Sequence, residues 1–439
     1  MIASKSDGNY MLKLQYQNED QLELDAVIQR VEVFASLRTP YHSVKIQLLC
    51  NARVWAANQV YGRDDYSLLI IKMTEDQHPE APVFLSLTCI HTDLPLTFKG
   101  QGTKNNDPYS MDPVTIYCIV NSTFTLMNTP VNKWISEKTP VTPMEAVDIL
   151  IANFLQPDPT LRVLIDKSNQ NEEKLPQLII PPMSFVDALR FLDQSFGLFS
   201  GPAFYFAMFP LSKTDPKPME KKTLYIHDLS TQIKKSEMWK LYVLGMDGNA
   251  SKEISEELKR DDRFYTFDTI QHIFTGNEDV LLQGGKNVVI SKPTNKLYKY
   301  TEMSIDDLKM SGLWDGPPSF EEAALTSKRT VFRNKNVSGT NDGNAFITSQ
   351  LSRRMSGSSE IQFTIFRNIT LKHLLKIGVP VEIDPQVEEY QMYRGKYIVS
   401  GSRIIFDKTS GGGTKHGDYW TITAEMRAIR SNLSYIGEK

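Results

Sequence analysis

Apolar and polar residues alternate with a period of two through most of residues 1–129. Leu12 and Leu14 show the pattern first, and Val44, Ile46 and Leu48 repeat it. This period is typical of strands with one buried face. Turn-forming segments such as YGRDD and TEDQHPEAP separate the runs, and further runs lie at residues 66–73, 82–90 and 113–120. The pattern predicts a small antiparallel sandwich or barrel over residues 1–129, with almost no helix.

The pattern changes to a helical one between residues 130 and 230. Thr142 precedes Pro143 and stands three positions before Glu145, which is the spacing of a capping box at a helix start. A second helix is predicted to begin at Ser184 and to end at Gly197. Two apolar runs, PAFYFAMFP and KTLYIHDL, then read as strands. Residues 130–230 are therefore predicted to form an α/β domain.

Residues 231–330 carry weaker signals, with strand-like pieces at FYTFDTIQHIF and KNVVI. We interpret them as an irregular α/β insertion that can include part of a second barrel. Residues 331–439 are clearer. A helical stripe of Ile347, Leu351 and Met355 precedes the strand IQFTIFRN. In GVPVEID, Pro380 indicates an edge strand. A long hairpin follows, from YRGKYIVSGSRIIF to DYWTITAEMRAIR, with Trp420 on its apolar face.

Composition excludes several classes of protein. The net charge is -3, and residues 331–439 carry 15 Lys or Arg against 10 Asp or Glu, a basic excess too small for a nucleic-acid-binding arm. No apolar run reaches the roughly 18 residues that a membrane-spanning helix needs, and the N-terminus does not read as a secretory signal. We therefore expect no stable membrane insertion. Cys50, Cys89 and Cys118 lie in apolar runs, which favours buried, reduced thiols over disulfides or a metal site.

The sequence offers little that resembles an active site. The seven histidines are scattered singly, with no HExxH pattern and no zinc-ligand spacing. No G-x-S-x-G elbow is present, and the adjacent carboxylates Glu388 and Glu389 lie in a polar stretch that reads as a solvated loop. Arg353 and Arg354 read as a solvated helix face or a salt bridge between subunits. We predict no catalytic residue, no cofactor and no metal site, and hence no enzyme.

The order of elements in the C-terminal segment carries a resemblance. A helix (GNAFITSQLSRRM) leads to a strand (IQFTIFRN), the phrase LLKIGVPVEID and a hairpin that ends in DYWTITAEMRAI. This order resembles the second tail-tube-like barrel of phage baseplate central hub proteins. That family includes the hub of contractile-tailed phages, the late control protein of temperate phages and the spike base of type VI secretion. The helix from Ser184, followed by the two aromatic-rich strands, is similar to the α/β domain between the two barrels of this family.

The resemblance implies an α+β, mainly β fold with two tail-tube-like antiparallel β-barrels and α/β domains inserted between them. The expected domains are a barrel over 1–129, the α/β domain over 130–230, the insertion over 231–330 and a second barrel over 331–439. It also implies a homotrimeric, pseudo-six-fold ring in the virion baseplate, assembled in the host cytoplasm. The implied partners are the tail tube protein, the central spike protein, the baseplate wedge proteins and the tape measure protein, with phage DNA passing through without sequence-specific binding. The interface candidates are Trp420, Arg353, Arg354 and Arg394.

Two other interpretations stay open at this point. One is a tail-associated peptidoglycan hydrolase whose carboxylate pair assembles only in space. The other is a receptor- or carbohydrate-binding tail-tip protein, in which Trp55, Trp134 and Trp314 contact sugars, although core or interface roles fit these side chains better.

Overall fold

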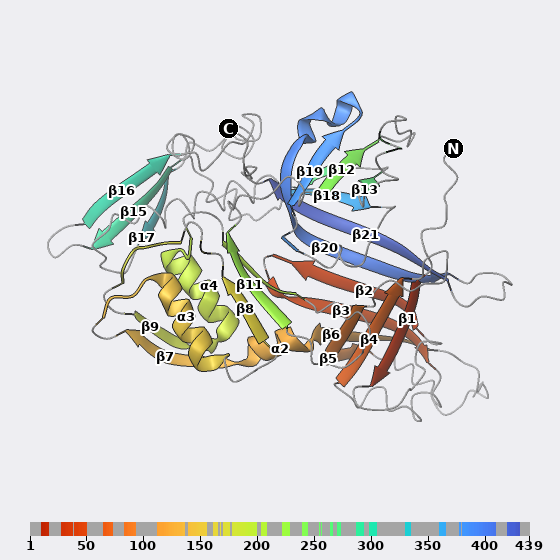
Figure 1. Cartoon of the computed structure of the whole chain (residues 1–439), viewed down its shortest axis with the longest axis horizontal. Helices are drawn as coiled ribbons and strands as arrows, with labels where there is room; N and C mark the ends of the chain where they lie inside the picture. Colours follow the sequence, from red (N-terminus) through yellow and green to blue (C-terminus); the bar gives the residue numbers. More distant parts are fainter. Residues whose placement is uncertain are drawn as a thin grey trace, which may run out of the picture.

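In the computed structural model, strands from the N-terminal and the C-terminal parts of the chain belong to one large sheet (Figure 1). It has 13 strands, in the order β1-β4-β5-β6-β3-β2-β20-β19-β12-β13, with β21, β18 and β14 branching from β20. The residues described are 10–16, 28–37, 39–50, 65–72, 83–93, 112–136, 139–155, 161–165, 167, 170–175, 178–199, 203–208, 222–228, 239–244, 254, 256, 264–266, 270–273, 287–293, 298–304, 330–334, 360–365, 377–378, 380–409 and 419–430.

Six strands from the first 120 residues form what we term the N-terminal half of this sheet. They pair antiparallel throughout, with β1 and β2 at the two ends of the arc. The strands are β1 (Tyr10–Tyr16), β2 (Ile28–Ser36), β3 (Thr39–Cys50), β4 (Asp65–Lys72), β5 (Val83–Asp93) and β6 (Asp112–Val120). The predicted period of two is confirmed: every second residue of β3, from His42 to Leu48, is buried.

Seven strands form the C-terminal half, and three of them come from residues 231–330. These are β12 (Trp239–Val243), β13 (Phe264–Thr266), β14 (Gln271–Ile273), β18 (Glu360–Ile365), β19 (Pro380–Pro385), β20 (Gly395–Thr409) and β21 (Tyr419–Arg430). The predicted C-terminal hairpin is confirmed as β20 and β21, which pair from Tyr397 to Thr409. A short 3-10 helix, η4 (Glu388–Tyr393), connects β19 to β20. The arc ends at β13 and β14, and β13 approaches β18, so this half is strongly curled.

The two halves join edge to edge inside the chain. Strand β2 pairs antiparallel with β20 from Arg30–Asp407 to Ser36–Gly401, and we call this pairing the seam. One apolar core runs under both halves, from Leu12 near the N-terminus to Ile429 near the C-terminus. In Figure 1 the C-terminal half (blue and green) lies above the N-terminal half (red and orange), with β20 and β21 beside β2.

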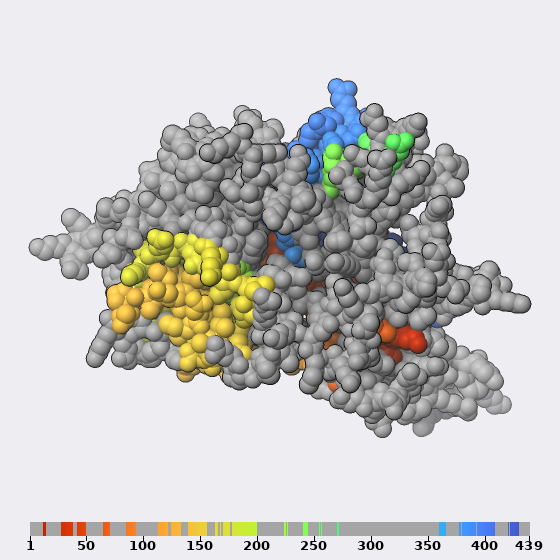
Figure 2. Space-filling view, viewed as in Figure 1, coloured from red at the N-terminus to blue at the C-terminus, as the bar shows by residue number. Residues whose placement is uncertain are grey.

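A separate α/β unit with its own core lies beside the N-terminal half. Its helices are α2 (Asn121–Asn128), α3 (Pro143–Phe154) and α4 (Phe185–Phe196). Its strands are β7 (Pro130–Ser136) paired with β9 (Leu178–Ser184), and β10 (Ala203–Met208), β11 (Lys222–Asp228) and β8 (Leu161–Ile165) in a second sheet. Helices α3 and α4 pack on each other, while α2 and β10 contact the N-terminal half. Figure 2 shows this unit (yellow and orange) at one side of the molecular face, away from the projecting blue segment.

Three more strands form a small sheet of their own: β16 (Tyr298–Ser304), β15 (Asn287–Pro293) and β17 (Thr330–Asn334). Strand β15 pairs antiparallel with β16 and parallel with β17.

The predicted helix starts are confirmed in atomic detail. The Thr142 Oγ1 accepts the Glu145 backbone N–H at 3.1 Å, and the Glu145 Oε2 accepts the Thr142 N–H at 2.7 Å. Helix α4 begins after Ser184 and stops at Gly197, whose φ of 76° is one that glycine adopts without strain. The helix predicted around Ile347 lies outside the described residues.

Two local predictions were wrong. Pro380 does not mark an edge, because β19 pairs with β20 on one side and with β12 on the other. It is the first residue of β19, where a missing N–H is tolerated, and pairing with β12 starts only at Val381. Helix α2 was not predicted, because its start has no side-chain cap and two Asn, two Thr and one Ser, all weak helix formers, make up five of its eight residues.

The mainly β class is confirmed, whereas two separate barrels with inserted domains are not. The described strands of both halves belong to a single sheet, and β1 and β2 are the ends of an arc that continues into β20. The sheet curls around its apolar core, so that β1 contacts β21 although the two strands are not paired.

Candidate functional site

The face of the sheet opposite the core is polar on both sides of the seam. Strand register aligns Glu425, Arg403, Phe34 and Ser43 across β21, β20, β2 and β3. The neighbouring row aligns Ile405 with Glu32 and Lys45 and then with Tyr117 of β6. Because side chains alternate across a strand, the residues between them face the core. We call this surface the polar face.

Charged side chains on the polar face connect the two halves at the seam. The Arg403 Nη2 lies 2.9 Å and its Nε 3.1 Å from the Glu32 Oε2, so two guanidinium donors converge on one carboxylate oxygen in charge-assisted hydrogen bonds. The Arg30 Nε donates to the Glu32 Oε1 at 2.8 Å, and the Arg30 Nη1 lies 3.2 Å from Asp407. The Arg403 Nη1 reaches Glu425 at 3.2 Å. Negative and positive groups thus alternate in a row of linked ion pairs, Asp407, Arg30, Glu32, Arg403 and Glu425.

Glu32 is the buried member of this row, with a side chain only 4% exposed. Burial by itself would raise the pKa of Glu32, but hydrogen bonds and charge from Arg403 and Arg30 outweigh it and hold the pKa below its usual value. The carboxylate is therefore ionised and fully committed to two guanidinium groups. Its partners come from opposite sides of the seam, so the pair stabilises the joined arrangement of the halves.

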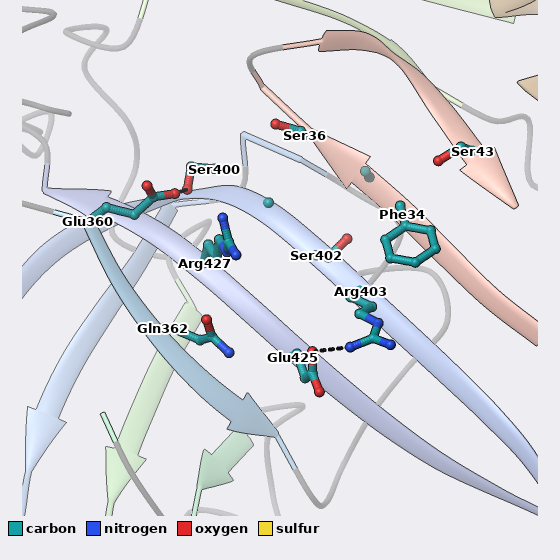
Figure 3. Close-up of a pocket in the computed structure, with 12 residues that line it drawn as sticks. Phe34, Ser36, Ser43, Glu360, Gln362, Ser400, Ser402, Arg403, Glu425 and Arg427 are labelled. Atoms are coloured by element: carbon teal, nitrogen blue, oxygen red, sulfur yellow. Dashed lines mark hydrogen bonds and ion pairs between the residues drawn. The ribbon is translucent and has the colours of Figure 1, made fainter. Parts of the chain in front are cut away.

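A hollow of about 440 Å³ opens on this face where β2, β20, β21 and β18 meet (Figure 3). Arg403, Glu425 and Arg427 line it from β20 and β21, and Phe34 of β2 lies beside Arg403, with the guanidinium carbon 5.7 Å from the ring centroid. At its end the Ser400 hydroxyl donates to the Glu360 carboxylate at 3.0 Å. The lining is mixed in charge.

The two carboxylates bound to Arg403 are poor candidates for acid–base chemistry. A glycosidase needs one carboxyl group with a raised pKa as general acid, whereas the pKa of Glu32 is lowered. Glu425, which lines the hollow, is bound to the same Arg403. Among the described residues, no group of three or more His, Cys, Asp or Glu side chains is placed to hold a metal ion.

Of the four predicted interface residues, the structure describes Trp420 and Arg394. Trp420 is 7% exposed and packs in the main core. Arg394 lies at the end of η4, where its Nη2 is 3.1 Å from Asp384 while most of its side chain is exposed. Arg353 and Arg354 lie outside the described residues. The interface role of all four stays a prediction.

Sequence reasoning missed Glu32 and Arg403. The signal was present in β2, where the charged residues Arg30 and Glu32 alternate with Val31 and Val33. Their partner could not be found, because Arg403 lies 371 residues further along the chain.

The fold matches solved structures of phage tail proteins. One is the tail protein from Neisseria meningitidis MC58, with a TM-score of 0.53 and 12% identity over 97% of this chain and 98% of that one. Another is the 43 kDa tail protein of prophage MuSo2 from Shewanella oneidensis, with a TM-score of 0.50 and 10% identity over 96% and 99%. The Francisella PdpA-VgrG complex also matches, at 12% identity over 99% of this chain and 60% of that one, but its TM-score of 0.46 is too low to show a shared fold.

The chain thus has the fold of these phage tail proteins over almost its whole length, and the predicted resemblance of its architecture is shown. No protein-family model matches the chain. A search of curated proteins finds no match by sequence. In the part of the chain that the structure describes, no helix has both the length and the apolar character needed to cross a membrane.

Proposed function

We propose that this chain is a structural hub subunit of a phage tail baseplate and has no catalytic role. The observation that carries the proposal is the seam: two strongly curled, mainly antiparallel halves are joined edge to edge within one polypeptide, in a fold shared with phage tail proteins. A protein that repeats such a join between chains builds a closed ring from laterally paired sheets.

In this proposal three copies form a homotrimer with six curled halves around a central channel. The ring joins a six-fold tail tube to a three-fold spike, since three chains with two halves each give six similar halves in a three-fold ring. The proposed division into 1–129, 130–230, 231–330 and 331–439 gives the two halves to the first and last segments, with strands β12–β14 completing the second. The α/β unit would face the baseplate wedge proteins.

The polar face is the proposed wall of the channel. It runs without interruption across the seam, so repetition around the ring would extend it into one continuous lining. Its alternating charges, with Arg30 and Arg403 neutralised by Glu32, Asp407 and Glu425, would let a tape measure protein and then DNA pass without tight binding. The chain would work in the virion after assembly in the host cytoplasm.

Mass and shape in solution test the proposal. Light scattering of the purified chain at micromolar concentration should give three times the protomer mass of 50.0 kDa. Electron microscopy of the same sample should show rings with a central hole. A monomer that also forms no ring when mixed with tail tube and spike proteins would refute the hub assignment, and clearing of cell-wall substrate by the purified chain would favour the hydrolase.

A further inference from the structure

Two cysteines stand directly opposite each other on neighbouring strands of the N-terminal half. The register of the antiparallel pair β5 and β6 matches Cys89 with Cys118. Opposed residues of antiparallel strands have Cα atoms about 4.5 or 5.5 Å apart, and a disulfide accepts about 4.4 to 6.8 Å. The Cα spacing typical of such a pair therefore lies within the range that a disulfide accepts. Both thiols are free in this structure.

A bulge beside the pair supplies the slack that a bond would need. The register shifts between Cys89 and His91, so Ile90 is an extra residue that lies 53% exposed. Opposed Cβ atoms are about 4.5 to 5.5 Å apart, whereas a disulfide prefers about 3.8 Å. Closing the bond must draw the strands slightly together, which favours a strained and easily reduced disulfide.

The two thiols differ in exposure and in reactivity. Cys89 is half-buried, and Cys118 is buried in the main core. A hydrogen bond from the Cys118 thiol lowers the pKa of Cys89 to about 6, although burial opposes this, and the Thr92 hydroxyl and the nearby His91 assist. The same hydrogen bond, together with burial, raises the pKa of Cys118. Cys89 is thus the more exposed and the more readily ionised thiol of the pair, and Cys118 is the buried one with the raised pKa, which is the arrangement of an attacking and a resolving cysteine.

The charged and titratable groups near Cys89 contact one another. His91 lies two residues on and contacts Asp93 at 2.7 Å. On β6 the ring of Tyr117 faces His91 with centroids 5.9 Å apart, and Lys45 of β3 lies over the same ring.

We propose that Cys89 and Cys118 form a reversible redox site that closes to a cross-strand disulfide by exchange with a small-molecule disulfide. The Cys89 thiolate attacks one sulfur of the oxidant, forms a mixed disulfide and releases one thiolate, which takes a proton from solvent. Cys118 then loses its proton and attacks the Cys89 Sγ, and the second half of the oxidant leaves as a thiol. The protein loses two electrons and the Cys118 proton, and with the one proton taken from solvent the oxidant is reduced to two thiols. The inference does not depend on the hub assignment.

The test uses the full chain and oxidised glutathione. Reduced protein is incubated with the oxidant, free thiols are blocked with N-ethylmaleimide, and the digest is mapped by mass spectrometry. We expect a linked peptide pair containing Cys89 and Cys118, with the loss of two hydrogen atoms, and its reversal by a dithiol reductant. A glutathione adduct that persists on Cys89 in the unmodified chain would overturn the proposal, as would both thiols remaining free or a bridge that uses Cys50.

Two further measurements keep the outcome clear. The variant Cys118→Ala should stop at the mixed disulfide on Cys89, because the resolving thiol is absent, while Cys89→Ala should leave Cys118 unmodified because it is buried. In the unmodified chain, the rate of Cys89 alkylation should rise with a midpoint near pH 6, and in Cys118→Ala the midpoint should move up toward about 8.5, the ordinary cysteine value. A midpoint that is the same in both proteins would refute the assigned roles.

Discussion

Breaking the Arg403–Glu32 pair at the seam tests whether these charges hold the two halves together. In Arg403→Met the aliphatic length is kept, but Glu32 loses two of its three hydrogen bonds to arginine. Its carboxylate then remains almost fully buried with Arg30 as its single charged partner in the described network. A buried carboxylate that loses donors destabilises the joined state more than an exposed one does.

The size of the effect follows from exposure. A hydrogen bond to a charged group contributes about 1.5–3 kcal/mol, and Arg403 is 39% exposed, so solvent screening reduces the Glu32–Arg403 coupling to about 1–2 kcal/mol. The same arginine also binds Glu425, whose side chain is 32% exposed. That pair is an internal control with an expected coupling of about 0.5 kcal/mol.

Hydrogen exchange of the backbone amides measures local opening of the seam. A double-mutant cycle would combine Arg403→Met with Glu32→Gln and, as control, with Glu425→Gln. A coupling of 1.4 kcal/mol corresponds to a tenfold change in the opening equilibrium of β2 and β20, and β7 and β9 should be unaffected. Equal couplings for Glu32 and Glu425, or unchanged exchange along β2 and β20, would refute the reasoning.

Three other predictions concern pH and the second core. His42 is fully buried, and burial lowers its pKa to about 3. Below about pH 6.5 the unfolded chain therefore binds more protons than the folded chain, so the free energy of unfolding falls with acid, by about 2 kcal/mol at pH 5. Urea unfolding measured across this pH range should show a weaker dependence of that free energy on pH for His42→Phe. Thr142→Ala should destabilise the first turn of α3 by about 1 kcal/mol, seen as faster amide exchange there, while Thr142→Ser should restore protection. Phe185→Ala should destabilise the α/β unit by about 3–5 kcal/mol, because the ring is fully buried. Backbone amides of α4 should lose protection from hydrogen exchange while those of the seam keep it. An equal loss of protection in both would contradict independent cores.

Local features of the chain were predictable because their causes lie within a few residues. The Thr142 and Ser184 caps, the stop at Gly197 and the alternation of β3 each depend on contacts or periods inside one short segment. Helix α2 was missed because its sequence carries no cap and mostly weak helix formers, so tertiary contacts with α4 and β5 must stabilise it. The burial of Cys118 was predicted, but the half-exposed position of Cys89 was not.

By itself the sequence determined the strand periods, the two capped helices and the mainly β class of this protein. Only the tertiary structure decided that β2 joins β20, that Glu32 meets Arg403 across 371 residues, and that Cys89 faces Cys118. The physical reason is that a period of two tells which face of a strand is buried but carries no information about which strand lies beside it. Partner choice depends on how all the apolar faces close around one core, and that is a property of the whole chain.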